Sequence, residues 1–88
     1  MGARIIYSGI VQGVGFRYTT FHYAKSLGVK GWVKNLADGR VAIEVFGDQE
    51  NIGKLIAMLD QHFAGSIQDK EINYIKDEGS FNDFRIVS

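Results

Sequence analysis

Residues 4–28, RIIYSGIVQGVGFRYTTFHYAKSLG, change their hydrophobic period midway, and this change decides the fold. Over residues 4–11 apolar side chains alternate between two sides, a period of two that predicts a strand. From Phe16 to about residue 26 they recur at helical spacing, and Gly28 follows as a C-terminal stop. The stretch therefore predicts a strand that enters a helix through a turn containing glycines.

The next two segments predict a hairpin. Residues 29–35 and 40–46 read as strands, and the second alternates cleanly between two faces. Between them lies the sequence Leu36-Ala37-Asp38-Gly39, whose Asp-Gly pair tolerates positive φ.

A second helix follows, with the clearest amphipathic pattern in the chain. Asp48 is a suitable N-cap, and Glu50 in the first turn suits the helix dipole. The apolar stripe consists of Ile52, Leu55, Ile56, Leu59 and Phe63. We expect Gly65 to end this helix.

Residues 69–77 and 82–87 predict two more strands, separated by Glu78-Gly79-Ser80. The order is β-α-β-β-α-β with a short extra C-terminal strand. Right-handed crossovers place both helices on the same face of the sheet. We therefore predict one α+β domain over residues 1–88, a ferredoxin-like α/β sandwich with a mainly antiparallel sheet.

The composition excludes several classes of site and location. The chain has no cysteine, so disulfides, thiolate metal sites and a cysteine nucleophile are excluded. No stretch approaches the roughly 20 apolar residues of a membrane helix, and the apolar N-terminal run is too short for a signal peptide. We expect a soluble, cytoplasmic protein with no membrane association.

The charges are unevenly distributed although the formal net charge is zero. Residues 1–37 contain five Lys and Arg residues and no acid, and all ten Asp and Glu residues lie at or after Asp38. A site built from the first part of the chain would attract an anion. Chance clustering on a solvated face is the alternative explanation.

The turn at residues 8–17 carries the first candidate site. A strand that enters a helix through a glycine turn points main-chain N–H groups at the positive end of the helix dipole. Gly13 and Gly15 permit close approach of a ligand, and Arg17 in the first helical turn is better placed if an anion lies beside it. A simple tight turn remains the alternative. The sequence matches neither a P-loop nor a dinucleotide-binding fingerprint.

Asn35, at the end of a predicted strand, is the second candidate. Its side chain could stabilise the following turn. Alternatively, its amide could hold a bound water, because it offers both a donor and an acceptor.

Together these two segments resemble the acylphosphatase family. The first signature is matched by Gly9-x-Val11-Gln12-Gly13-Val14-Gly15-Phe16-Arg17. The second is matched by Gly31-Trp32-Val33-Lys34-Asn35-x-x-x-Gly39-x-Val41, followed by Gly47. The expected order of helices and strands agrees with this family over the whole chain. Departures are small: Ile10 stands where many members carry Arg, and neither Arg17 nor Asn35 is affected.

The resemblance implies an enzyme, a hydrolase acting on acid anhydrides in phosphorus-containing compounds. Its substrate would be a small-molecule acyl phosphate, cleaved to a carboxylate and inorganic phosphate. The phosphoryl group would be bound by Gln12, Gly13, Val14, Gly15, Phe16 and Arg17. The catalytic residues would be Arg17 and Asn35, with Asn35 positioning the attacking water. The resemblance implies no metal, no cofactor and no covalent intermediate.

Two other functions remain open. One is a non-catalytic module that binds acyl phosphate or carbamoyl phosphate, as such domains do in larger proteins of hydrogenase maturation. The absence of zinc-finger cysteines or a linker favours a stand-alone enzyme. The other is an RNA-binding ferredoxin-like domain, which the zero net charge and the aliphatic 40–46 strand disfavour, so no nucleic-acid partner is expected. A monomer is expected, although a late edge strand could pair with another chain.

Overall fold

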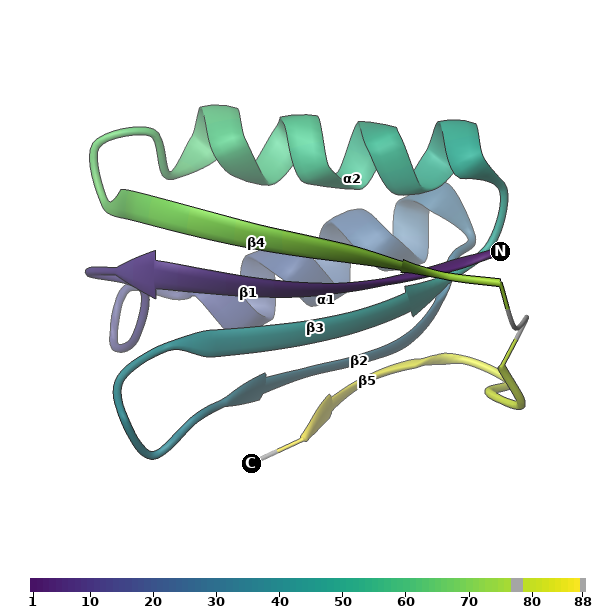
Figure 1. The fold of residues 1–88 in the computed structure, drawn as a ribbon, viewed down its shortest axis with the longest axis horizontal. Helices are drawn as coiled ribbons and strands as arrows, with labels where there is room; N and C mark the ends of the chain where they lie inside the picture. The colour runs from purple at the N-terminus through teal and green to yellow at the C-terminus, as the bar shows by residue number, and fades with distance from the viewer. Residues whose placement is uncertain (77–78, 88) are drawn as a thin grey trace.

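The computed structural model describes residues 1–76 and 79–87. The elements, in chain order, are β1 (Gly2–Gly9), α1 (Phe16–Leu27), β2 (Lys30–Asn35), β3 (Val41–Phe46), α2 (Gln49–His62), β4 (Ile67–Ile75) and β5 (Phe84–Val87). The strands form one sheet in the order β4-β1-β3-β2-β5. Only the β2–β5 pair among these is parallel. Both helices lie on one face of the sheet (Figure 1). The predicted ferredoxin-like α+β fold and the short C-terminal strand are confirmed.

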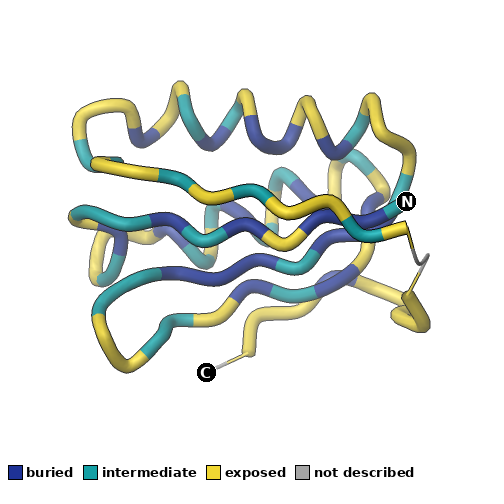
Figure 2. The backbone as a smooth tube through the Cα atoms, viewed as in Figure 1, coloured by how far each residue is buried: buried dark blue, intermediate teal, exposed yellow. Residues whose placement is uncertain are grey.

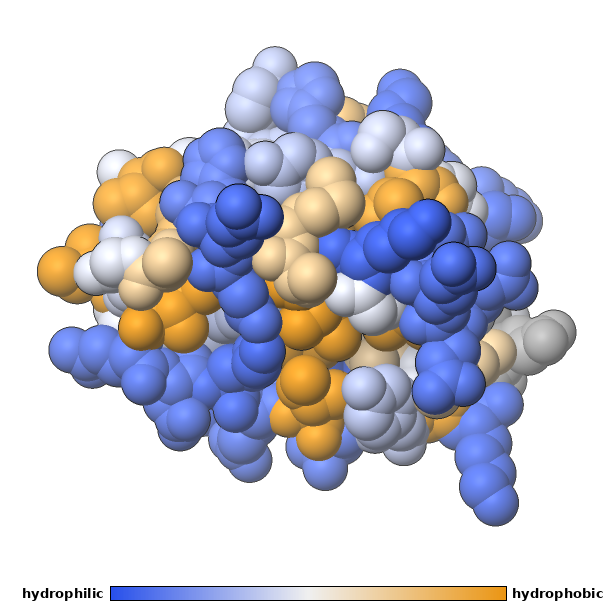
Figure 3. All heavy atoms as spheres, turned by 90° about the horizontal axis from the view of Figure 1, so that it is seen from above, coloured by the Kyte–Doolittle hydropathy of each residue, from blue (hydrophilic) through white to orange (hydrophobic). Residues whose placement is uncertain are grey.

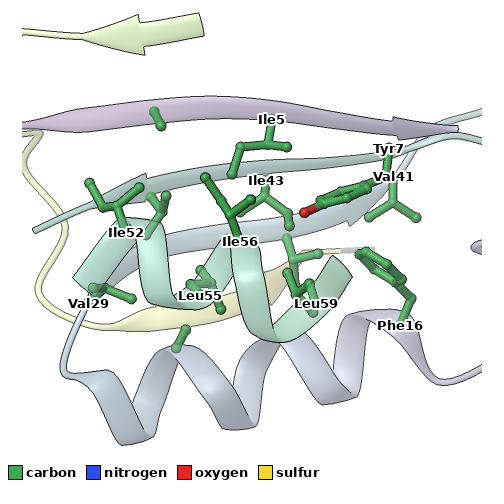
Figure 4. Packing of buried hydrophobic residues seen from close by; sticks show 14 of the residues in the cluster. Ile5, Tyr7, Phe16, Val29, Val41, Ile43, Ile52, Leu55, Ile56 and Leu59 are labelled. Atoms are coloured by element: carbon green, nitrogen blue, oxygen red, sulfur yellow. The ribbon is translucent and has the colours of Figure 1, made fainter. Parts of the chain in front are cut away.

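The core lies between the sheet and the two helices. Buried residues concentrate on the central strands and on the sheet-facing side of α2 (Figure 2). Ile5 and Ile43 from the sheet meet Leu55 and Leu59 from α2, and all four are fully buried (Figure 4). At roughly 1.5–3 kcal/mol for each fully buried aliphatic side chain, this contact stabilises the placement of α2.

Several predicted boundaries were wrong. The first strand is Gly2–Gly9 rather than residues 4–11, because Gly9 adopts φ +124° and the β1–β4 register shifts between Ser8 and Gly9. Ile10 leaves the β ladder, and its N–H donates to the Ser66 carbonyl at 2.8 Å. The bulge turns the chain out of the sheet where the glycine turn begins.

The end of α2 also differs from the prediction. The helix ends at His62, and Phe63 is its C-cap, so Gly65 lies beyond the helix. The side chain of Phe63 is buried against Phe16, which holds the chain at this point. The cap prediction at Asp48 is confirmed by position, although its side chain forms no capping hydrogen bond. Gly28 caps α1 with φ +71°, as predicted.

The last two predicted strands are shifted as well. The segment predicted over residues 69–77 is β4, Ile67–Ile75, and position 77 lies outside the described residues. The segment predicted over residues 82–87 is β5, Phe84–Val87. Its first residues precede the ladder, in which Gly31 pairs with Phe84.

The edge strand β4 is shielded by polar side chains. Seen from above, over α2 and β4, hydrophilic side chains dominate the surface and hydrophobic ones form small groups between them (Figure 3). The β4 sequence IQDKEINYI places Asp69, Lys70 and Glu71 in succession on this edge. Charged side chains on an edge strand discourage pairing with another sheet. In the described residues no helix is long and apolar enough to cross a membrane.

Candidate active site

The site lies at the end of the sheet where the 10–15 loop and the β2–β3 turn come together (Figure 1). The loop leaves β1 and leads into α1. Gly13 has φ +76° and Gly15, the N-cap of α1, has φ +82°. Side-chain-bearing residues rarely adopt this left-handed conformation, so the glycines explain how the turn forms.

The main-chain N–H groups of residues 12–18 have no acceptor among the described residues. Within residues 1–76 and 79–87, no N–H of residues 12–18 donates a hydrogen bond, and no side chain caps α1. The first turn of α1 contains no acidic residue. Orphan N–H groups at the positive end of a helix dipole form a site for an anion.

Phe16 anchors the end of the loop in the core. Its side chain is 1% exposed, and its ring centroid lies 5.0 Å from that of Tyr7 and 4.6 Å from that of Phe63. Figure 4 shows the Phe16 and Tyr7 rings at this end of the core. Thr20 also hydrogen-bonds back to the Phe16 carbonyl at 2.8 Å. Only the main-chain N–H of Phe16 is therefore available to a ligand.

Gln12 joins the loop to the β2–β3 turn. Its Nε2 donates to the Leu36 carbonyl at 2.7 Å and to the Arg40 carbonyl at 2.9 Å. The same turn is closed by the Leu36 N–H, which donates to the Arg40 carbonyl at 2.8 Å. Because Leu36 directly follows Asn35, these bonds set the loop against the end of β2.

Arg17 and Asn35 meet at a cavity of about 290 Å³ beside the loop. No Asp or Glu is among the described residues that line it. Arg17 forms no ion pair with any described residue. The Oδ1 atom of Asn35 is buried and has no hydrogen-bond partner within the described part of the chain. A buried acceptor without a partner carries an energetic cost, which a bound water or ligand would remove.

The structure brings together most of the predicted site residues. The lining of the 290 Å³ cavity includes five of them: Gly13, Gly15, Phe16, Arg17 and Asn35. Val14 is 41% exposed and lies outside the lining, as does Gln12, whose side chain is engaged with the turn. Their predicted contact with a phosphoryl group through main-chain N–H groups stays a prediction.

Sequence analysis missed three lining residues, Val11, Tyr18 and Ile86. Val11 was assigned to the first strand, although its place at the start of the loop marked it as a candidate. Tyr18 directly follows Arg17 and is 63% exposed. Ile86 reaches the site only because β5 pairs with β2, and no local pattern signals that proximity.

Two pKa values near the site are perturbed. Burial, together with the neighbouring carboxylate of Asp60, raises the pKa of Tyr7 well above its usual value, and the Tyr7 hydroxyl donates to Asp60 at 3.1 Å. In the β2–β3 turn, the main-chain N–H of Arg40 donates to Asp38, which lowers the pKa of that carboxyl group. The Arg40 side chain adds to this effect.

In the described residues no group of three or more His, Asp or Glu side chains could hold a metal ion. Beside the orphan N–H groups, the described residues that line the cavity supply the guanidinium of Arg17, the amide of Asn35 and the hydroxyl of Tyr18. These features define a small ferredoxin-like α+β protein with a glycine-containing loop whose N–H groups lack acceptors among the described residues.

Comparison with known proteins identifies the family. The sequence profile described as "Acylphosphatase" matches residues 3–86, and the chain belongs to the acylphosphatase family. An acylphosphatase of Methanothrix thermoacetophila is 39% identical over 85 residues, covering 96% of this chain and 93% of the relative.

Comparison with solved structures points to the same family. The crystal structure of acylphosphatase from Bacillus subtilis has a TM-score of 0.90 and 33% identity, covering 99% of this chain and 98% of that one. HypF of T. kodakarensis is also similar, with a TM-score of 0.84 and 33% identity. The match covers 100% of this chain and 12% of HypF.

Proposed function

We propose that the protein hydrolyses the carboxyl-phosphate bond of small acyl phosphates, releasing a carboxylate and inorganic phosphate. The observation that carries this proposal is the meeting of Arg17, Asn35 and the orphan N–H groups of residues 12–18 at one cavity. Membership of the acylphosphatase family supports the same activity.

In the proposed mechanism, the loop N–H groups and Arg17 hold the phosphoryl oxygens. Residues Gln12 to Phe16 contribute main-chain donors, and the guanidinium offers two parallel hydrogen bonds to the phosphoryl group. Charge on the phosphoryl oxygens is compensated in the transition state by these fixed donors. Arg17 has no ion-pair partner among the described residues, so binding an anion breaks no ion pair that the structure describes.

Asn35 positions the attacking water. Its buried Oδ1 can accept a hydrogen bond from that water, which orients the oxygen lone pair toward phosphorus. The water oxygen forms a bond to phosphorus as the bond from phosphorus to the carboxylate oxygen breaks. The proton of the water passes to a phosphoryl oxygen or to bulk water. A carboxylate is a good leaving group, so the reaction needs no strong general acid, metal or cofactor.

The test is phosphate release from benzoyl phosphate in excess EDTA, carried out in H₂¹⁸O. We expect turnover with ¹⁸O found in inorganic phosphate, because water attacks phosphorus. Label in benzoate would contradict attack on phosphorus. No turnover by the folded protein would refute the proposed activity.

A binding module without catalysis is the second candidate. The similarity to a small part of HypF favours it, because this fold also occurs within a much longer chain. Phosphate binding without hydrolysis of benzoyl phosphate would select this alternative. We further propose a monomer, which the charged β4 edge supports. Cytoplasmic location and the absence of a nucleic-acid partner stay predictions from the sequence.

A further inference from the structure

A second cavity of about 540 Å³ adjoins the site between α1 and β5. Ile86 lines both this cavity and the one that holds Arg17 and Asn35. Its side chain is 40% exposed, so it is accessible from solvent at the junction. The two cavities therefore share a wall.

One stripe of α1 runs from the first cavity to the second. Arg17 lines the first, whereas Phe21 and Lys25, at i+4 and i+8 from it, line the second. Eight residues of α-helix span about 12 Å. An extended chain of about eight carbons covers roughly 8–10 Å, at about 1.2 Å per bond. Such a chain, attached to a phosphoryl group held near Arg17, would reach the second cavity.

The second cavity combines apolar and cationic residues. Phe21 and Phe84 provide aromatic surface next to Ile86. Lys25 and Lys30 also line it, and neither forms an ion pair with a described residue. The Lys25 ammonium lies 5.6 Å from the centroid of the Phe21 ring, so a positive charge lies beside the apolar surface.

The acidic residue among the described residues of this lining, Asp83, is already paired. The carboxylate of Asp83 accepts a hydrogen bond from the Arg85 Nε at 2.9 Å, and both residues line the cavity. Among the described lining residues, the two lysines therefore leave an excess of positive charge. An anionic group at the end of an apolar chain complements this arrangement.

We propose that this second cavity binds the acyl part of the substrate and favours acyl phosphates that carry a carboxylate at the end remote from the phosphoryl group. The proposal rests on the proposed hydrolysis of acyl phosphates and adds a preference for their acyl end. The phosphoryl group stays at Arg17, the methylene chain passes Ile86, and the terminal carboxylate meets Lys25 and Lys30.

The experiment compares octanoyl phosphate with the monophosphate of suberic acid, which has the same number of carbons and a terminal carboxylate. The variant is Lys25→Gln with Lys30→Gln. The matched control is Lys54→Gln with Lys76→Gln, which removes the same charge from positions outside both cavities. We expect the parent to prefer the suberic acid derivative about threefold to tenfold in kcat/KM, as one or two exposed ion pairs allow.

The cavity variant should hydrolyse both eight-carbon substrates at similar kcat/KM, and the control should keep the parental preference. An equal loss of the preference for the suberic acid derivative in the control would overturn the proposal. It would show long-range attraction of the anion by the protein's charge rather than a local site. A parent that does not prefer the carboxylate would also overturn it. Acetyl phosphate, too short to reach the second cavity, reports the basic activity separately. Its hydrolysis without any preference among longer substrates would refute this inference and leave the proposed function intact.

Discussion

Replacing Gln12 by Ala tests whether the loop must be tied to the β2–β3 turn for catalysis. The change removes the two hydrogen bonds from Nε2 to the carbonyls of Leu36 and Arg40, at 2.7 and 2.9 Å. Both carbonyls keep one main-chain donor, Gly39 and Leu36 respectively. They are therefore not left wholly unsatisfied, and the cost stays near the net value of two hydrogen bonds.

At about 0.5–1.5 kcal/mol for each of the two bonds, we expect Gln12→Ala to lower the free energy of unfolding by about 1–3 kcal/mol. In a chain of this length each kcal/mol shifts Tm by about 4–8 °C, so the fall in Tm should be roughly 4–24 °C. We also expect a loss of activity in molecules that stay folded, because the loop would no longer be held in a fixed position relative to Asn35. A misplacement of about 1 Å can cost roughly 100-fold, so we expect kcat/KM to fall about 10-fold to 100-fold.

The assays are urea unfolding and hydrolysis of benzoyl phosphate. Gln12→Met, which keeps a chain of similar length without a donor, separates lost packing from lost hydrogen bonds and should behave like Gln12→Ala. Gln12→Glu should be worse than either, because a carboxylate would face two carbonyl oxygens. Unchanged stability and activity in Gln12→Ala would show that the loop does not depend on these two hydrogen bonds.

Three further predictions follow from the same structure. Gly15→Ala should lower the free energy of unfolding by about 1 kcal/mol, because φ is +82° and the added Cβ meets no atom within 4 Å. The control Gly39→Ala, with φ +95° and equal space, should lower it by the same amount in denaturant unfolding. Only Gly15→Ala should lower kcat/KM. Asn35→Ala should change the free energy of unfolding by less than about 0.5 kcal/mol, because its Oδ1 has no partner among the described residues. It should lower kcat about 100-fold. A large loss of stability with normal kcat would show that Asn35 stabilises the β2–β3 turn instead. The raised pKa of Tyr7 means that its folded form keeps the proton above pH 10 while the unfolded form loses it, so this contribution to stability is complete below pH 10 and declines as pH rises further. The parent's stability advantage over Tyr7→Phe should therefore shrink by up to about 1.4 kcal/mol per pH unit above pH 10 in urea titrations, and a constant advantage would contradict the assignment.

The order of helices and strands could be predicted because hydrophobic period is a local property. Residues 40–46 alternate, and the α2 stripe recurs at helical spacing whatever the rest of the chain does. The end of β1 depends on a distant contact instead. Ile10 donates to Ser66, far along the chain, and the bulge at Gly9 accompanies that bond. No pattern within residues 4–11 contains this information.

The candidate site divides in the same way. Arg17 and Asn35 could be named from two short motifs, each beside a turn marked by glycine. The hydrogen bonds of the Gln12 side chain could not be predicted, because their acceptors are the main-chain carbonyls of Leu36 and Arg40, in a turn far along the sequence. Ile86 was missed because strand pairing, rather than sequence, brings it to the cavity.

The role of Arg17 is tested most sharply by hydrolysis of benzoyl phosphate in excess EDTA, with inorganic phosphate binding measured alongside. The proteins compared are the parent, Arg17→Lys and Arg17→Ala. We predict turnover by the parent and loss of both turnover and phosphate binding in Arg17→Ala. Arg17→Lys should recover only part of each, because an ammonium cannot make two parallel hydrogen bonds. If folded Arg17→Ala bound phosphate and hydrolysed benzoyl phosphate like the parent, Arg17 would not be the residue that holds the phosphoryl group.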